Sequence, residues 1–249
     1  LSTFEFSLVR ESLKERRVLT NIAPNFVHPV PFLFSIYKNG KTSNSMMKVG
    51  MLLYELFSFD KNWLWDKSKK MPFHKGVSAK TVKKLIPNAI KKDLVGAQIY
   101  YDCSSHSPER LTLAFIKSAV KYGASVANYT EVNDFILEDK EKYKSVKGVI
   151  VTDKLSGKRH NIRAKLVINC AGPWADILLD KAKKNIDNQV LRRSEGIHFV
   201  TKKLVDKYIF TGETSNGKHF FLVPYRNHTL IGTTDKEYIG KPDDYKVTK

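Results

Sequence analysis

Apolar side chains recur at helical spacing in two segments of the first third of this chain. Residues 4–21 and 46–57 each gather most of their apolar residues on one face, so both are predicted to be amphipathic helices. Between them, residues 28–37 have the pattern of an extended segment, and its prolines confine it to a sheet edge or to the start of a strand. A short helix is expected at 78–85, because Pro87 would stop it.

The middle of the chain has the pattern of an alternating α/β unit. Ser107, Pro108 and Glu109 form a strong helix start, since they supply an N-cap, a proline at the first helical position and an acid in the first turn. Gly123 is placed to end that helix. A β-hairpin with its turn at 154–157 follows. The expected strands are 96–102, 124–132, 146–152, 158–164 and 165–169, the last of them buried.

The last third of the chain turns to β structure. Short apolar segments are separated there by turn residues, of which Asn216-Gly217 and Arg226-Asn227 are the clearest signals. The expected strands are 197–201, 208–210, 218–224 and 229–234.

One segment, residues 166–176, combines structural and chemical signals. It runs from the predicted buried strand through Gly172 and Pro173 into a helix. A glycine at a strand end lets the backbone approach a flat ligand closely, and a proline one position later can open a helix without losing a hydrogen bond. By geometry alone, an ordinary connection between a strand and a helix explains the same pattern. Cys170 within it is interpreted as a small core residue.

Composition places the chain among the globular proteins, with 42% hydrophobic and 11% aromatic residues in 249. A membrane-spanning helix is not expected, because the longest apolar run, 46–59, is interrupted by Lys48, Gly50 and Glu55. Two cysteines are too few for a disulfide framework or a Cys-x₂-Cys zinc site. The histidines lack the spacing of metal ligands, so no metal site is predicted.

The formal net charge of +18 has three interpretations. It can belong to a lysine-rich solvated surface, to attraction toward an anionic membrane face or a phosphorylated substrate, or to a nucleic-acid interface. The lysines lie in short runs scattered along the chain, and no alternation of aromatic and basic residues resembles an RNA-binding motif. Nucleic acid is therefore not an expected partner, while the first two interpretations stay open.

Six ordered blocks resemble segments of one enzyme family. The blocks are APNFVHPVPF (23–32), YDCSSHSPERL (101–111), YGASVANYTEV (122–132), VINCAGPWAD (167–176), GIHFVT (196–201) and TLIGTTDKEYIG (229–240). The third is similar to the family's segment almost letter for letter. Together, over nearly the whole chain, they resemble the FAD-dependent glycerol-3-phosphate dehydrogenases and the related glycerophosphate oxidases.

This resemblance implies a mixed α/β (α+β) fold. Part of an FAD-binding domain, of the glutathione-reductase and D-amino-acid-oxidase type, would be interleaved with an antiparallel-sheet substrate domain. Residues 1–95 would form the first part of the substrate domain with its helices, 96–190 the middle of the FAD-binding domain, and 191–249 the antiparallel strands of the substrate domain.

The resemblance also implies roles for residues near the cofactor and at the reacting centre. Val132 is expected to meet the FAD adenine through its backbone, and Ala171, Gly172 and Trp174 are expected to border the dinucleotide. His198 matches the family's active-site histidine, although a structural histidine is the interpretation that residue type alone favours.

Three residues of the last block are similar to family residues near the substrate pocket, namely Thr233, Thr234 and Asp235. For these, a satisfied polar strand end is an equally good interpretation.

The dinucleotide fingerprint G-x-G-x-x-G does not occur in this sequence, because no two glycines stand two residues apart. The family places that motif upstream of a segment like residues 1–21. We therefore expect the chain to be the central portion of a longer enzyme, which by itself neither holds FAD tightly nor is active.

The activity that the resemblance implies is oxidation of sn-glycerol 3-phosphate to dihydroxyacetone phosphate, with hydride transfer to FAD and electrons passed to quinone. Alternatives are an oxidase that uses oxygen, a related amino-acid-oxidising flavoprotein, or a basic binding module. The expected location is a peripheral membrane surface: the mitochondrial inner membrane in a eukaryote, otherwise the cytoplasmic face of the cell membrane.

Overall fold

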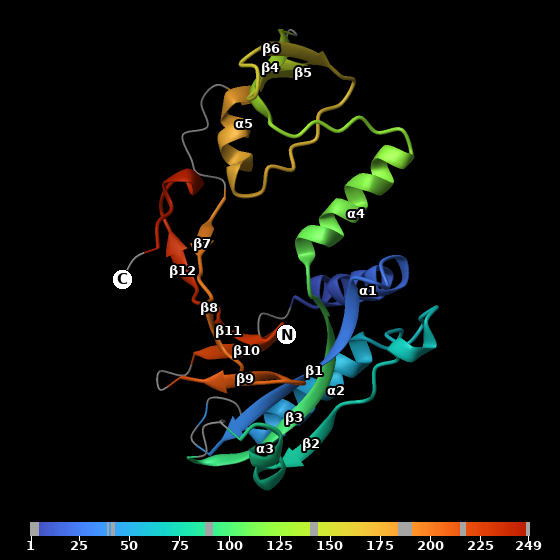
Figure 1. The fold of residues 1–249 in the computed structure, drawn as a ribbon, viewed down its shortest axis with the longest axis vertical. Coiled ribbons are helices and arrows are strands. Elements are labelled where there is room, and N and C mark those ends of the chain that lie inside the picture. Colours follow the sequence, from blue (N-terminus) through green and yellow to red (C-terminus); the bar gives the residue numbers. More distant parts are fainter. Residues whose placement is uncertain are drawn as a thin grey trace. The chain divides into compact units, whose positions relative to one another are not determined.

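The chain divides into two compact units in the computed structural model of Figure 1, which describes residues 5–38, 40, 43–87, 92–139, 144–183, 191–214 and 218–247. Unit 1 comprises Leu1–Ser118 and Ile197–Thr234, and unit 2 comprises Ala119–Gly196 and Asp235–Lys249. Each unit therefore contains segments that are distant in the sequence.

A seven-stranded mixed sheet forms the centre of unit 1, with the strand order β2-β3-β1-β9-β10-β11-β8. Its strands are β1 (Val27–Tyr37), β2 (Lys75–Ser78), β3 (Leu94–Ser105), β8 (Phe199–Lys202), β9 (Ile209–Glu213), β10 (His219–Tyr225) and β11 (His228–Gly232). The β1–β9 pair is parallel, and the other pairs of this sheet are antiparallel. The parallel pair joins the early strands of the chain to the late ones.

The core of unit 1 lies against this sheet and draws on both ends of the chain. Leu33 of β1, Val82 of α3 (Ala79–Leu85) and Phe210 of β9 are at most 1% exposed and belong to one cluster. Full burial of such a side chain contributes about 1.5–3 kcal/mol. These contacts stabilise the sheet in which β8 and β11 are neighbouring strands.

Of the two predicted positions for the prolines of residues 28–37, a sheet edge is wrong, and Pro29 and Pro31 lie in the first half of β1. β1 lies inside the sheet, between β3 and β9. It pairs with β3 along its length, but its register with β9 covers only Phe32 to Phe34. Pro29 and Pro31 precede this stretch, so the prolines stand where β1 has one neighbour, and their missing N–H groups cost the ladder little.

The predicted helices of unit 1 are confirmed within the described residues. They are α1 (Phe6–Ile22), α2 (Asn44–Phe57) and α3, and a short 3₁₀ turn, η1 (Lys67–Lys69), lies between the last two. The Ser43 hydroxyl accepts a hydrogen bond from the Met46 N–H (3.2 Å), and the Ser78 hydroxyl accepts one from the Thr81 N–H (3.3 Å). Serine N-caps therefore fix the starts of α2 and α3.

Helix α4 (Pro108–Lys121) begins at the predicted proline and is followed by Gly123, whose φ is +91°. A left-handed residue is the usual way to end a helix, so this prediction is confirmed. None of the α4 side chains is buried.

Unit 2 contains two small antiparallel sheets and one helix. Strands β4 (Thr130–Asp139), β5 (Lys144–Asp153) and β6 (Arg159–Arg163) form one sheet, and β7 (Arg193–Glu195) pairs with β12 (Lys236–Tyr238) in the other. Helix α5 (Ala175–Lys183) follows the 3₁₀ turn η2 (Gly172–Trp174), and η3 (Pro242–Asp244) follows β12. The β5–β6 hairpin is the predicted one, and Gly157 in its turn has φ +72°.

Two predicted strands of unit 2 are wrong. The strand expected at 124–132 begins only at Thr130, and residues 165–169 do not form a strand. Leu166 and Ile168 are each 74% exposed, and Cys170 is exposed rather than part of a core. The apolar alternation was real, but a strand needs a neighbour for its N–H and C=O groups, and no described strand pairs with this segment.

In the last third, the Arg226-Asn227 turn is confirmed. It joins β10 to β11, with Tyr225 opposite His228, and Arg226 adopts φ +54°. The Asn216-Gly217 turn lies outside the described residues. Within the described part of the chain, no helix is long and apolar enough to cross a membrane.

The mixed α/β fold class is confirmed by these elements. The domain ranges predicted from the sequence remain a prediction, because the division into two compact units does not show which unit binds the cofactor and which binds the substrate. Strand β3 and residues 108–118 lie in unit 1, where β3 pairs with β1.

Candidate functional site

The predicted dinucleotide-contacting residues include one tight turn in unit 2. Ala171 precedes η2, Gly172 opens it with φ +54°, and Pro173 occupies its first turn. Gly172 is exposed, and nothing lies within 4 Å of the place where a Cβ would stand. This backbone is therefore open to close approach by a ligand.

Side chains on both sides of this turn hold it in place. The Asn169 amide nitrogen donates to the Ala175 carbonyl (2.8 Å), and its amide oxygen accepts from the Ala171 N–H (3.2 Å). The Arg193 Nε donates to the Pro173 carbonyl (2.9 Å), and the same guanidinium pairs with Asp176. The side chains of Arg193 and Asp176 are each 9% exposed, so the turn rests on a largely buried ion pair.

Trp174 forms part of a cavity of about 270 Å³ within unit 2. Tyr238 and Tyr245 also line it, with their rings edge to face at 5.8 Å. The Trp174 indole N–H donates to Asp243 Oδ2 at 3.1 Å. The cavity wall thus contains three aromatic side chains, from η2, from β12 and from the residue after η3.

Val132 lies on a different element of unit 2. It is half-buried on β4 opposite Val151, and the register shifts directly after it. The Lys181 ammonium of α5 donates to the Asn133 carbonyl at 2.8 Å, which ties this strand to the helix that follows η2. The structure therefore places Val132 in the same unit as Gly172, on a strand linked to the same helix.

His198 and the two candidate threonines come together at one end of unit 1. His198 is exposed just before β8, and Thr233 and Thr234 are exposed just after β11. The Ile197 N–H donates to Thr234 Oγ1 (2.9 Å), and the Thr234 N–H donates to the Ile197 carbonyl (3.3 Å). These two hydrogen bonds join the residue directly before His198 to Thr234.

Gly232 completes this arrangement. A Cβ at Gly232 would lie 2.9 Å from the Ile197 carbonyl oxygen and 3.0 Å from His198 Cδ2. The close approach of β11 to the histidine therefore requires glycine. An exposed imidazole can accept a proton and can hydrogen-bond a hydroxylated substrate. Asp235 follows Thr234 directly and is exposed.

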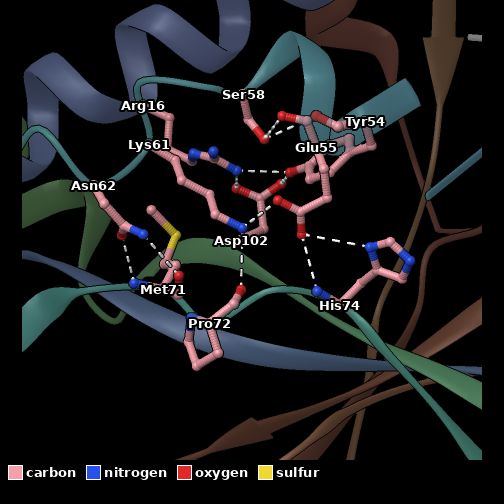
Figure 2. A network of polar contacts seen from close by, with 10 residues as sticks. All are labelled: Arg16, Tyr54, Glu55, Ser58, Lys61, Asn62, Met71, Pro72, His74 and Asp102. Atoms are coloured by element: carbon pink, nitrogen blue, oxygen red, sulfur yellow. Dashed lines mark hydrogen bonds and ion pairs between the residues drawn. The ribbon is translucent and has the colours of Figure 1, made fainter. Parts of the chain in front are cut away.

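A buried polar network in unit 1 was missed by the sequence reasoning (Figure 2). Arg16 of α1 donates to the Tyr54 hydroxyl (2.6 Å) and to Asp102 Oδ1 (3.2 Å), and the Tyr54 hydroxyl donates to Asp102 Oδ2 (2.9 Å). Burial, and then the neighbouring Asp102 carboxylate, raise the pKa of Tyr54 far above its ordinary value. The phenol therefore stays protonated and serves as a fixed donor between α2 and β3.

A second part of the network fixes the segment that follows α2. Glu55 is paired with Lys61, and its Oε1 accepts from the His74 N–H (3.0 Å); Lys61 Nζ also donates to the Pro72 carbonyl (3.0 Å). Glu55 is 8% exposed, although in the sequence it only interrupts an apolar run. An acid at that position of an apolar helix was the available signal.

Asp60, which is 1% exposed, joins the segment after α2 to α1 through ion pairs. Arg10 donates to both of its oxygens (2.9 and 2.7 Å), and Arg17 Nε lies 3.0 Å from Oδ2. The hydrogen bonds from Arg10 hold the pKa of Asp60 below its ordinary value. Within the described residues, no group of three or more His, Cys, Asp or Glu side chains is placed to hold a metal ion.

A family match shows the class of protein to which this fold, with its Gly172 turn and its His198 group, belongs. A model of the DAO family, described as FAD dependent oxidoreductase, matches residues 2–249. The chain therefore belongs to the FAD-dependent oxidoreductase family, which confirms the class and the cofactor predicted from the sequence.

Within that family, its relatives act on glycerol phosphate according to their names. A glycerol-3-phosphate dehydrogenase from Synechocystis sp. is 30% identical over 263 residues, which are 100% of this chain and 45% of the relative. An alpha-glycerophosphate oxidase from Streptococcus pneumoniae is 30% identical over 100% of this chain and 40% of the relative. A probable mitochondrial glycerol-3-phosphate dehydrogenase from Dictyostelium discoideum is 30% identical over 94% of this chain and 36% of the relative.

A solved structure supports the same relationship. The glycerol-3-phosphate dehydrogenase from Bacillus halodurans, complexed with FAD, superposes with a TM-score of 0.71 at 28% identity, over 94% of this chain and 40% of that one. The predicted resemblance is thereby confirmed. The chain spans less than half the length of each of these relatives.

Proposed function

We propose that the protein containing this chain oxidises sn-glycerol 3-phosphate to dihydroxyacetone phosphate and passes the electrons to a quinone. The observation that carries this proposal is the fixed position of His198 beside Gly232 and Thr234. An imidazole held in this way, and open to solvent, is suited to take the proton of a substrate hydroxyl. The names of the relatives supply the substrate class.

In this proposal the residues of unit 1 act on the substrate. His198 accepts the proton of the C2 hydroxyl through an imidazole nitrogen. The Thr233 hydroxyl donates to the Thr234 carbonyl (2.9 Å), so in this proposal its oxygen accepts from a substrate hydroxyl, and Thr234 supplies a second hydroxyl group. The Thr234 oxygen already accepts the Ile197 N–H, so its own proton can be donated to the substrate.

The residues of unit 2 hold the cofactor in this proposal. Ala171, Gly172 and Trp174 border the dinucleotide, since the Gly172 backbone is open to close approach. Val132 meets the adenine through its backbone. FAD, when bound, would supply the acceptor for the hydride that leaves C2 of the substrate. The Arg193–Asp176 pair keeps the turn in the shape that these contacts require.

Two electron acceptors, quinone and oxygen, are compatible with the names of the relatives. Quinone is the acceptor of a dehydrogenase, whereas oxygen is that of an oxidase, and relatives carry both names. With quinone as the acceptor, we place the protein on an anionic membrane surface, toward which its net charge of +18 draws it. That surface is the mitochondrial inner membrane in a eukaryote and otherwise the cytoplasmic face of the cell membrane; the name of the Dictyostelium relative includes the word mitochondrial.

Steady-state kinetics of the complete protein test this function. Glycerol 3-phosphate is compared with glycine and proline as substrates, with a short-chain quinone or oxygen as the acceptor. We expect turnover of glycerol 3-phosphate alone and faster reduction of quinone. His198→Ala should lower kcat by about 10²–10⁴. His228→Ala, an exposed histidine of β11, is the matched control and should retain the activity. Normal turnover of His198→Ala would remove this residue from the mechanism.

A further inference from the structure

Helix α2 presents its apolar side chains outward. Met46, Val49, Leu52, Leu53 and Leu56 recur at helical spacing, and they are 65%, 60%, 60%, 39% and 66% exposed. Residues three, four or seven apart share one face of a helix, so these five side chains form one apolar surface. We call it the outward face of α2.

The inward face of the same helix combines the buried Met47 with polar side chains that are hydrogen-bonded or ion-paired. Tyr54 hydrogen-bonds Asp102, and Glu55 pairs with Lys61 and accepts the His74 N–H (Figure 2). Rotation of the helix to bury the apolar residues would expose these ion pairs and leave their partners without hydrogen bonds. The network therefore holds the apolar surface outward.

The segment directly after the helix continues the apolar character. Phe59, Trp63 and Trp65 are 63%, 63% and 76% exposed, and Phe59 and Trp63 meet edge to face with their centroids 5.9 Å apart. Tryptophan and phenylalanine are the side chains that favour the boundary between lipid headgroups and acyl chains. They lie within nine residues of Leu56 in the sequence and alternate there with buried residues such as Ser58 and Asp60.

The exposed charges of residues 43–76 are mostly positive. Lys48, Lys67, Lys70 and Lys75 are exposed. Of the three acids in this stretch, Glu55 and Asp60 are buried in ion pairs, and Asp66 alone is exposed. Lysines beside apolar and aromatic side chains complement an anionic surface with an apolar interior.

We infer that the outward face of α2, together with Phe59, Trp63 and Trp65, docks on the surface of an anionic lipid bilayer. The helix lies in the plane of the headgroups, with its leucines toward the acyl chains and its lysines on the phosphates. This inference deepens the proposed membrane association and rests on it, and it assigns that association to one helix and the segment after it.

Vesicle sedimentation of the complete protein tests this assignment. Vesicles of phosphatidylcholine alone are compared with vesicles that also contain phosphatidylserine. Wild type should bind the anionic vesicles, and Leu56→Glu should bind them at least about tenfold more weakly. Leu155→Glu, which changes a 78% exposed leucine in the β5–β6 turn, is the matched control and should bind as wild type does.

A second pair of variants tests the charge. Lys67→Glu with Lys70→Glu should weaken binding to anionic vesicles about tenfold or more. Lys158→Glu with Lys207→Glu, two exposed lysines elsewhere, should not. Circular dichroism and thermal unfolding of every variant establish that it is folded.

Each outcome is decisive. Equal binding of wild type and the α2 variants would overturn the assignment and leave the membrane proposal standing, whereas no vesicle binding by wild type would end both. A dimer that Leu56→Glu dissociates, without vesicle binding, would show that a second copy covers this face and would overturn the lipid assignment. Oxidation of glycerol 3-phosphate in detergent is measured in parallel, because it reports on the enzymatic proposal independently.

Discussion

Gly232 lies so close to His198 that a Cβ at this position would stand 3.0 Å from Cδ2 of the imidazole. The same atom would be 2.9 Å from the Ile197 carbonyl oxygen. Because one of these neighbours is backbone and the other is a side chain, the ring is the group that would have to move. The glycine of the TLIGTTD block thus sets the position of the histidine of the GIHFVT block.

Gly232→Ala should therefore displace His198 and destabilise unit 1. Overpacking of this kind costs about 1–3 kcal/mol, which urea unfolding can measure. In the complete protein, kcat for glycerol 3-phosphate should fall with it. Gly50→Ala is the control, since Gly50 lies in α2 with nothing within 4 Å of its Cβ position. That change should leave stability equal or slightly higher. Equal stability of both variants would contradict this close packing around Gly232.

Arg193 and its neighbour Arg192 offer a second comparison within unit 2. Arg193→Met removes the partner of Asp176 and the donor to the Pro173 carbonyl. Loss of one member of a buried pair should lower the free energy of unfolding by about 3 kcal/mol and weaken FAD binding to the complete protein. Arg192 is 82% exposed where it pairs with Glu237, so Arg192→Met should change stability by less than about 0.5 kcal/mol. Urea titrations and flavin fluorescence measure both effects, and similar losses for the two variants would refute this role of Arg193.

Local signals predicted those elements whose ends are set by their own residues. The Ser107-Pro108-Glu109 start of α4, the short helix expected at 78–85 and the Arg226-Asn227 turn all stand where the sequence placed them. In each case the hydrogen bonds or the left-handed φ that fix the element come from residues close in the sequence.

The errors arose where distant partners decide the structure. Leu166 and Ile168 alternate as in a strand, but only a neighbouring strand makes one, and the described residues pair none with them. Helix α2 was predicted correctly, but its inward face was not, because Tyr54 and Glu55 bind partners 48 and 19 residues away, Asp102 and His74. The proximity of His198 to Gly232 likewise depends on the pairing of β8 with β11.

Tyr54 should make stability depend on pH at the alkaline end. Its pKa in the folded chain is raised, so the folded state keeps a proton that the unfolded chain releases near pH 10. The contribution is fully present below about pH 10 and is lost as the pH rises above it, because the folded state then binds more protons than the unfolded one.

Tyr54→Phe should remove this contribution. It deprives Asp102 and Arg16 of a partner, so unfolding near pH 7 should become easier by about 1–3 kcal/mol. The fall in stability above about pH 10 should become shallower than in wild type. Tyr122→Phe, at a residue that is 84% exposed, should alter neither quantity. Urea unfolding between pH 7 and pH 11 provides both measurements, and an unchanged alkaline slope in Tyr54→Phe would contradict the prediction.

The two cysteines should differ in reactivity toward a thiol reagent. Burial raises the pKa of the Cys103 thiol, whose Sγ lies 3.5 Å from the Thr20 hydroxyl, whereas Cys170 is exposed beside the Gly172 turn. Because the thiolate is the reacting form, Cys170 should be modified at least about tenfold faster at pH 8. In a time course with a chromogenic disulfide, Cys170→Ser should abolish the fast phase and Cys103→Ser should preserve it. In the complete protein, saturating FAD should slow this phase if the cofactor borders the turn, and loss of the fast phase in Cys103→Ser instead would reverse the assignment of the two thiols.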